Sequence, residues 1–217
     1  MLHTKKNVVF ILVAVLSMAT TAFAGDSPED IKQRIGTGDP VAGKIKSAAC
    51  QGCHGETGNS VAPNFPKLAG QYAHYIARQT RDYQNTLRND PMMSGMSSAA
   101  LERQDLFDIA AYFASQKQMK GDGKSTSEAG KKLYIEGNVT NLIYGCINCH
   151  GKEGKGMSPG NSFFPVIGGQ TREYLVKTMI DFKKGDRKND PSGMMANIAR
   201  GLSDADIEAL ADYLSGL

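Results

Sequence analysis

The sequence predicts an all-α protein built from two tandem domains. Two pentapeptides of the same form, Cys50–His54 and Cys146–His150, lie about 100 residues apart. Apolar residues recur at helical spacing in each half, and no stretch alternates between apolar and polar residues as a strand would. The chain of 217 residues is long enough for two small domains. We therefore expect a tandem duplication of one helical unit.

Composition and charge exclude several classes of protein. Hydrophobic residues make up 41% of the chain and charged residues 22%, as in a soluble globular protein and unlike a collagen-like, disordered or polytopic membrane chain. The formal net charge of +3 is too small for a nucleic-acid-binding surface. Four cysteines are too few for a dense disulfide framework.

The first 24 residues have the order of a secretory signal. Lys5 and Lys6 precede an apolar run from Val8 to Met18, and the segment ends on Ala22-Phe23-Ala24. We expect cleavage after Ala24 and export, most simply to a bacterial periplasm. The alternative, an uncleaved N-terminal anchor, is disfavoured because the apolar run is short for a membrane span and the cleavage site is well formed.

The first domain is expected over 25–115. Asp39 and Pro40 are typical of a helix start, and the helix would run into Cys50. Two further helices follow from their apolar faces. Those faces comprise Tyr72, Tyr75, Ile76, Gln79 and Tyr83 in the middle helix, and Leu106, Ile109, Ala110 and Phe113 in the last.

The second domain is expected over 128–217, after a linker at 116–127 that is rich in Lys, Gly, Asp, Ser and Thr. Ser203 and Asp206 form an acidic version of a capping box before its last helix. Its apolar faces comprise Leu175, Met179 and Phe182 in the middle helix, and Ile207, Leu210, Ala211 and Leu214 in the last. The long segment between middle and last helices is expected to be an irregular loop in both domains.

The repeated pentapeptides predict covalent haem. Two cysteines at i and i+3 and a histidine at i+4 share one helix face. The thiols of Cys50 and Cys53, and of Cys146 and Cys149, can then form thioethers to one haem each, while His54 and His150 become axial iron ligands. A thioredoxin-like pair would need a βαβ pattern, and a zinc site would need more cysteine or histidine than either half offers.

Counting histidines restricts the second axial ligand. Of the four, His3 lies in the signal segment, His54 and His150 are proximal ligands, and His74 points away from the apolar face of its helix. At least one haem therefore lacks a second histidine within the chain, and methionine is the obvious alternative. The candidates precede the last helix of each half: Met92, Met93 and Met96, then Met194 and Met195. Met119 in the linker and Met179 on an apolar face are set aside.

These features together resemble the dihaem cytochrome c4 family. The resemblance rests on both C-x-x-C-H sites, on the loops Phe65–Gln71 and Phe164–Gln170, and on the methionines before each last helix, and it covers 37–217. It implies two tandem class I cytochrome c domains, each a few short helices wrapped around one covalently bound haem c. It also selects Met93 and Met195 as distal ligands, with Met96 as the alternative in the first domain.

Further roles are expected of other residues in each half. The resemblance implies that the carbonyl groups of Pro66 and Pro165 accept a hydrogen bond from the proximal histidines, although a rigid turn is an alternative reading of each proline. Gly43 and Gly130 would allow close helix crossings over the last helix of each half. The two arginines before the methionine segments, Arg88 and Arg187, either pair with haem propionates or lie in solvated loops.

Two haems with both axial positions occupied predict an electron carrier rather than an enzyme. By resemblance, the donor would be a membrane cytochrome bc complex that oxidises quinol, and the acceptor a terminal haem–copper oxidase or another periplasmic reductase; peripheral membrane association fits such partners. The alternatives are a dihaem oxidoreductase such as a peroxidase, which needs an open iron site, and a haem sensor or a haem subunit of a larger respiratory complex.

Overall fold

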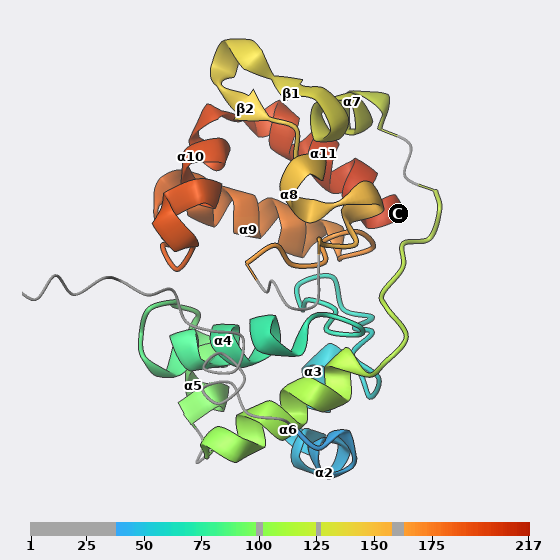
Figure 1. The fold of residues 1–217 in the computed structure, drawn as a ribbon, viewed down its shortest axis with the longest axis vertical. Coiled ribbons are helices and arrows are strands. Elements are labelled where there is room, and N and C mark those ends of the chain that lie inside the picture. Colours follow the sequence, from blue (N-terminus) through green and yellow to red (C-terminus); the bar gives the residue numbers. More distant parts are fainter. Residues whose placement is uncertain (1–37, 99–101, 125–126, 158–162) are drawn as a thin grey trace, which may run out of the picture.

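The computed structural model describes residues 38–98, 102–124, 127–157 and 163–217. The expected signal peptide at 1–24, its cleavage site after Ala24 and the start of the first domain lie outside these residues. The described helices form two groups, one above the other along the long axis of the molecule (Figure 1). We refer to 38–115 as the first half and to 128–217 as the second half. None of the helices within the described residues is long and apolar enough to cross a membrane.

The first half contains five described helices, and the expected helix faces are buried except at Tyr72 and Tyr75, which are half-buried. The N-terminal helix begins at Asp39, whose side chain accepts the backbone N–H of Val41 at 2.8 Å, and ends at Ser47 rather than running through to Cys50. The bounds are α2 (Pro40–Lys46), α3 (Ala48–His54), α4 (Ala73–Gln84), α5 (Pro91–Ser98) and α6 (Arg103–Ala114). The core joins α4 to α6 through Ile76, Ala77, Phe107, Ile109, Ala110, Tyr112 and Phe113.

The second half repeats this plan. The predicted capping box is present, since Ser203 Oγ accepts the backbone N–H of Asp206 and the Asp206 carboxylate accepts that of Ser203. The helices are α7 (Glu128–Glu136), α8 (Ile147–His150), α9 (Arg172–Lys184), α10 (Met194–Gly201) and α11 (Asp204–Gly216), with short 3-10 turns η1 (Val139–Asn141), η2 (Lys152–Gly154) and η3 (Pro191–Gly193). The expected apolar faces of α9 and α11 are buried.

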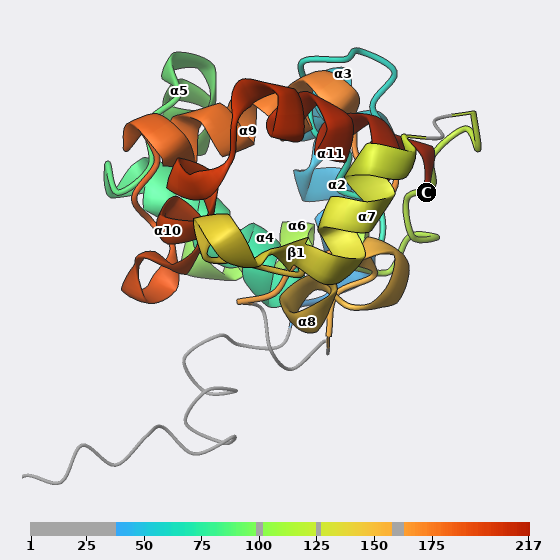
Figure 2. The ribbon, with the colours of Figure 1, turned by 90° about the horizontal axis from the view of Figure 1, so that it is seen from above.

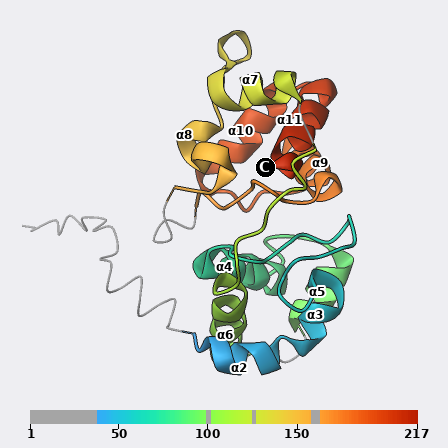
Figure 3. The same ribbon diagram turned by 90° about the vertical axis from the view of Figure 1, so that its right-hand side faces the viewer.

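The structure differs from the sequence-based expectation in two further places. The methionine-bearing segments are helices, α5 and α10, and not irregular loops. The second half also contains a small antiparallel pair, β1 (Gly137–Asn138) and β2 (Ile143–Tyr144), in which Gly137 is opposite Tyr144. This hairpin projects beyond α7 at the end of the molecule farthest from α2 (Figure 3). Each strand has two residues, which is too short for an alternation pattern to be visible in the sequence.

Two glycines allow the close helix crossings that the sequence predicts. A Cβ atom on Gly43 would lie 1.9 Å from the carbonyl oxygen of Asp108, and one on Gly130 would lie 1.9 Å from that of Ala209. Without side chains at these positions, α2 packs on α6 and α7 packs on α11, as the view from above shows for the second pair (Figure 2). The last helix of each half is thereby fixed in the same way.

The segment between the halves is held against both of them. Met119 is buried, and its backbone N–H donates to the carbonyl of Ala69 at 2.9 Å. Further along, the backbone N–H of Gly123 donates to Gly216 at 3.2 Å. The expected linker is therefore an ordered connection along one side of the molecule wherever it is described (Figure 1).

Candidate haem sites

A cavity of about 1320 Å³ extends through both halves. It exceeds the 300–1,000 Å³ that is usual for one ligand, and apolar surface dominates its lining. Every residue that the sequence predicts as a haem ligand or attachment point lines it. These residues are Cys50, Cys53, His54, Met93, Cys146, Cys149, His150 and Met195.

The two histidines are held in the same way. His54 lies at the end of α3 and its Nδ1 is 2.8 Å from the carbonyl oxygen of Pro66, while Nδ1 of His150, at the end of α8, is 3.0 Å from that of Pro165. Both rings are buried, and burial lowers the pKa of each histidine. Since the carbonyl can only accept, Nδ1 carries the proton and Nε2 is left as the free ligand atom of a neutral imidazole.

The cysteines lie beside these histidines as free thiols. Cys50 and Cys53 are on α3, one turn apart, while Cys146 and Cys149 occupy the N-cap and third residue of α8. Burial raises the pKa of Cys50, and it raises that of Cys146 to about 11. Each pair lines the apolar cavity, and within the described residues no cluster of three or more metal-binding side chains offers a zinc site.

The methionines differ in exposure. In α5, Met92 is 53% exposed and Met96 is 42% exposed, whereas Met93 is half-buried. In α10, Met194 is 40% exposed and Met195 is half-buried. All five line the cavity, and the inner member of each group is the one that the family resemblance selects. His74 is half-buried and does not line the cavity.

A buried polar cluster lies where the two halves meet. The Oε1 atom of Gln79 accepts from Arg88 at 2.7 Å, from Arg187 at 2.9 Å and from Asn189 at 3.0 Å. Arg88 also donates to the Tyr174 hydroxyl of the second half at 2.9 Å. Both arginines are buried, so the reading that places them in solvated loops is wrong.

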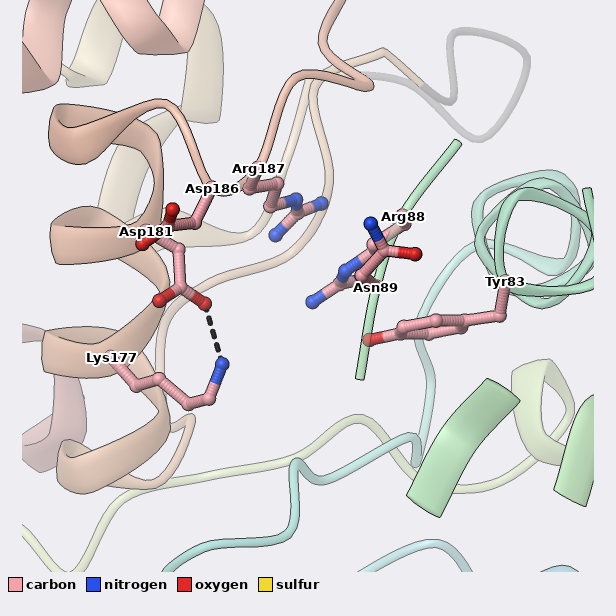
Figure 4. Close-up of a pocket in the computed structure, with 7 residues that line it drawn as sticks. All are labelled: Tyr83, Arg88, Asn89, Lys177, Asp181, Asp186 and Arg187. Carbon is pink, nitrogen blue, oxygen red and sulfur yellow. Dashed lines mark hydrogen bonds and ion pairs between the residues drawn. The ribbon is translucent and has the colours of Figure 1, made fainter. Parts of the chain in front are cut away.

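The arginines approach the junction from opposite halves. Figure 4 shows their guanidinium groups at a polar pocket of about 210 Å³, beside Tyr83 and the ion pair of Lys177 with Asp181. Burial acts to raise the pKa of the Tyr174 phenol, but the charges of Arg88 and Arg187 lower it to about 8. The two guanidinium charges thus outweigh the effect of burial on this phenol.

The residues present fit haem in two respects. The Nε2 amide of Gln79 is buried without a partner in the described structure, and it lies among two buried guanidinium groups that also line the large cavity. Carboxylate groups are the natural complement of such donors, and haem carries two propionates. A haem requires apolar walls, paired thiols, a neutral imidazole and buried cations near its propionates. The cavity provides these in both halves.

Sequence reasoning missed three parts of this site. Gln79 appears in the sequence only as a member of a helix face, and Gln71 and Gln170 only as the last residues of repeated loops. Gln71 and Gln170 could have been identified because they recur at matching positions of the two halves. Gln79 could have been identified because it is a polar residue on an otherwise apolar helix face.

Comparison with known proteins identifies the family. The family model described as Cytochrome c matches the chain twice, at 42–117 and 127–217. The chain is 42% identical to "Cytochrome c4" of Pseudomonas aeruginosa over 182 residues, which cover 83% of this chain and 89% of that protein. It is 32% identical over 210 residues to the "Thiosulfate dehydrogenase electron acceptor" of Stutzerimonas stutzeri, covering 94% of this chain and 92% of that one.

A solved structure is similar over both halves. The crystal structure of reduced recombinant cytochrome c4 from Pseudomonas stutzeri superposes with a TM-score of 0.77 at 40% sequence identity. The similarity covers 83% of this chain and all of that one.

Proposed function

The chain belongs to the cytochrome c family and, within it, to the dihaem cytochromes c4. From this premise we propose that it carries single electrons from a quinol-oxidising cytochrome bc complex to a terminal haem–copper oxidase or another periplasmic reductase. As a member of that family it holds two covalently bound haem c groups and transfers electrons. The observation that supports the proposal most is the single cavity, because it brings both sets of ligand side chains to one continuous space.

In this proposal each half holds its haem by its own residues. Cys50 and Cys53 provide the thioether sulfurs of the first haem and Cys146 and Cys149 those of the second. His54 and His150 are the proximal ligands. Met93 and Met195 are the distal ligands, because each is the less exposed methionine of its segment. When bound, the haem iron supplies the one-electron redox chemistry.

The chain's own residues set the conditions for that chemistry. The apolar lining excludes water and favours the less charged, reduced state. The Pro66 and Pro165 carbonyls keep the proton on Nδ1 of each histidine and so fix the ligand nitrogen. Arg88 and Arg187 provide buried positive charge between the halves, where propionates would otherwise be unpaired.

The remaining assignments follow from the same premise. We place the domains at 25–115 and 128–217, joined by 116–127, and the signal peptide at 1–24. The location is the periplasm, where such a segment directs export. With a histidine and a methionine holding each haem iron, no ligand position would remain for a substrate, and the chain would act as a carrier and not as an enzyme.

Reconstitution tests the proposed partners. The purified dihaem protein is mixed in a stopped-flow instrument with the quinol-reduced bc complex, and separately, after reduction, with the oxidase. Reduction by the first and oxidation by the second, each at a rate that increases with complex concentration, is the expected result. Exchange with neither complex would contradict the proposal.

A second donor is favoured by one specific observation. The relative from Stutzerimonas stutzeri, similar over nearly the whole of both chains, is named an electron acceptor of thiosulfate dehydrogenase. The same stopped-flow experiment with a thiosulfate-reduced dehydrogenase as donor distinguishes the two. Faster reduction by the dehydrogenase than by the bc complex would show that the dehydrogenase is the preferred donor. The proposed role as an electron carrier would be unchanged.

The enzymatic alternative has its own test. A peroxidase-like oxidoreductase needs an open iron position, so the reduced protein would bind carbon monoxide rapidly and stoichiometrically at neutral pH. We expect no such binding within the time in which the haems transfer electrons. Rapid binding at either haem would favour the enzyme.

A further inference from the structure

A glutamine of the first half holds the loop that contacts the second histidine. The Oε1 atom of Gln71 accepts the backbone N–H of Val166 at 3.0 Å, and its Nε2 donates to the Val166 carbonyl at 2.7 Å. Both hydrogen bonds are buried. Val166 directly follows Pro165, whose carbonyl is 3.0 Å from Nδ1 of His150.

A glutamine of the second half makes the equivalent contact with the first half. The Oε1 atom of Gln170 accepts the backbone N–H of Lys67 at 2.7 Å, and its Nε2 donates to the Lys67 carbonyl at 2.9 Å. Lys67 directly follows Pro66, whose carbonyl is 2.8 Å from Nδ1 of His54. Each proline loop is therefore paired with a glutamine from the opposite half.

The geometry of the peptide bond connects these contacts to the histidines. The carbonyl of Pro165 and the N–H of Val166 belong to one peptide group, which is planar and rigid. When Gln71 holds that N–H, it also fixes the direction in which the Pro165 oxygen points. The same relation joins Gln170 to the Pro66 carbonyl through the N–H of Lys67.

We infer that Gln71 and Gln170 are positioning residues, each of which orients the proximal histidine of the opposite half through the proline carbonyl. The orientation and basicity of a metal-bound imidazole depend on the acceptor at its other nitrogen. Closure of the two halves is thereby coupled to the ligand field at both irons. The inference rests on the proposed roles of His54 and His150 as iron ligands.

The glutamines are themselves fixed. Gln71 is 4% exposed and Gln170 is 5% exposed. Oε1 of Gln71 also accepts the N–H of Tyr72 at 3.0 Å, and Oε1 of Gln170 that of Thr171 at 2.9 Å. Nε2 of Gln170 lies 3.6 Å from the sulfur of Met119. A buried amide whose partners are all satisfied has little freedom to turn, so each glutamine is a rigid support.

The two supports are unequal. Lys67 has a second attachment, because its Nζ donates to the carbonyl of Gly169 at 2.7 Å and to that of Lys120 at 2.8 Å. Val166, at the matching position, is apolar and its side chain can make no such bond. We therefore expect His150 to depend more on Gln71 than His54 depends on Gln170.

The test measures the ring proton of each histidine. In the reduced, ¹⁵N-histidine-labelled dihaem protein, NMR follows exchange of the Nδ1 protons with solvent. Gln71→Leu should speed exchange at His150 about tenfold, as expected when two buried hydrogen bonds are removed, and leave His54 within about twofold of wild type. Gln170→Leu should give the reverse pattern with the smaller effect. In a separate potentiometric titration, Gln71→Leu should shift the reduction potential of the second haem alone.

Controls separate positioning from general loosening. Gln84→Leu removes a glutamine contact that stays within the first half, to the carbonyl of Ser97, and should change neither proton. Intact mass confirms two haems in each variant. If Gln71→Leu does not mature, Gln71→Asn, one methylene shorter, should give the same pattern.

The outcomes are distinct. Unchanged exchange at His150 in the Gln71 variant, or equal acceleration at both histidines, would overturn the inference. If the wild-type ring protons show no ring-current shift from haem, the ligand assignment under the proposed function fails instead.

Discussion

The two halves repeat the same functional residues on different supports. In the first half, Lys46 of α2 forms ion pairs with Asp105 at 2.7 Å and with Asp108 at 2.5 Å, and Asp108 also accepts the backbone N–H of Asp39 at 2.8 Å. In the second half, Ala209 stands at the position of Asp108, and the core cluster has ten buried residues against seven in the first half.

This difference shows which features the duplicated fold requires. The glycine crossing, the histidine–proline pair, the buried arginine and the cross-contacting glutamine occur in both halves. The ion cluster and the hairpin occur in one half each among the described residues. The features proposed to hold haem and those that join the halves are therefore shared, whereas the means of attaching the first helix is free to differ.

The largest expected effect comes from filling the glycine positions where α2 crosses α6 and α7 crosses α11. Gly43→Ala and Gly130→Ala each place a Cβ atom 1.9 Å from a backbone carbonyl oxygen. Because that oxygen belongs to a packed helix and cannot move aside, each substitution should lower the free energy of unfolding of its half by about 3 kcal/mol. Chemical denaturation followed by the Soret band measures this.

Gly52→Ala is the matched control for the crossing, because a Cβ atom there meets nothing within 4 Å. It should leave stability within about 0.5 kcal/mol of wild type. A small effect at Gly130 with a large one at Gly43 would contradict the equivalence of the two halves.

The next effect tests the distal ligands. Met195→His should lower the reduction potential of the second haem on the order of 0.1 V, since axial ligands set haem potentials over about 0.8 V and methionine raises them. Met93→His should do the same for the first haem. Spectroelectrochemical titration separates the two, and Met194→Leu and Met96→Leu are the controls that should leave both potentials unchanged. A shift in either control would reassign the ligand.

The junction between the halves is tested by Gln79→Leu. Three donors, from Arg88, Arg187 and Asn189, would lose their shared acceptor. We expect a loss of about 2 kcal/mol, confined to the coupling between halves, so that the unfolding transitions of the two halves, followed at each haem, move further apart than in wild type. Unchanged transitions in both halves would show that the halves are coupled by other contacts.

The smallest effect concerns the ion cluster of the first half. Burial acts to raise the pKa of Asp108, but hydrogen bonds from Lys46, Asp39 and Gln104 lower it overall. A carboxylate whose folded pKa is lowered stabilises the fold above its unfolded pKa, and that contribution is lost as pH falls through the folded value. The first half should thus lose stability below about pH 4.

Asp108→Asn weakens this acid dependence at a cost of about 1 kcal/mol at neutral pH. The second half, with Ala209 in that place, should lose less stability in acid, because its carboxylates with a lowered pKa, Glu153 and Asp204, form ion pairs at the exposed surface. Thermal melts between pH 3 and 7, followed at each haem, measure both. Equal acid sensitivity of the two halves would show that the cluster is not its source.

Local patterns predicted much of the fold and the site. The apolar faces of α4, α6, α9 and α11 and the capping box at Ser203 are properties of neighbouring residues, and they are found as expected. The lining of the cavity by both pentapeptides follows from the motif itself.

The features that the sequence could not reveal depend on contacts between distant segments. Arg88 and Arg187 are buried at the junction, where each donates a hydrogen bond to the opposite half, and the Gln71 contact joins residues 95 positions apart. The α5 helix contains Ser94 and Gly95, which weaken any helical pattern. Periodicity therefore gave no basis for predicting it.

The central claim is that each half carries its own haem on its own pentapeptide, and intact-mass measurement of protein matured in a host with cytochrome c assembly tests it most directly. The wild-type chain should have the mass of the mature polypeptide plus two haems. Each of the double variants, Cys50→Ala/Cys53→Ala and Cys146→Ala/Cys149→Ala, should have the mass of its polypeptide plus one haem. A wild-type chain without haem, or a double variant that retains two, would contradict the account.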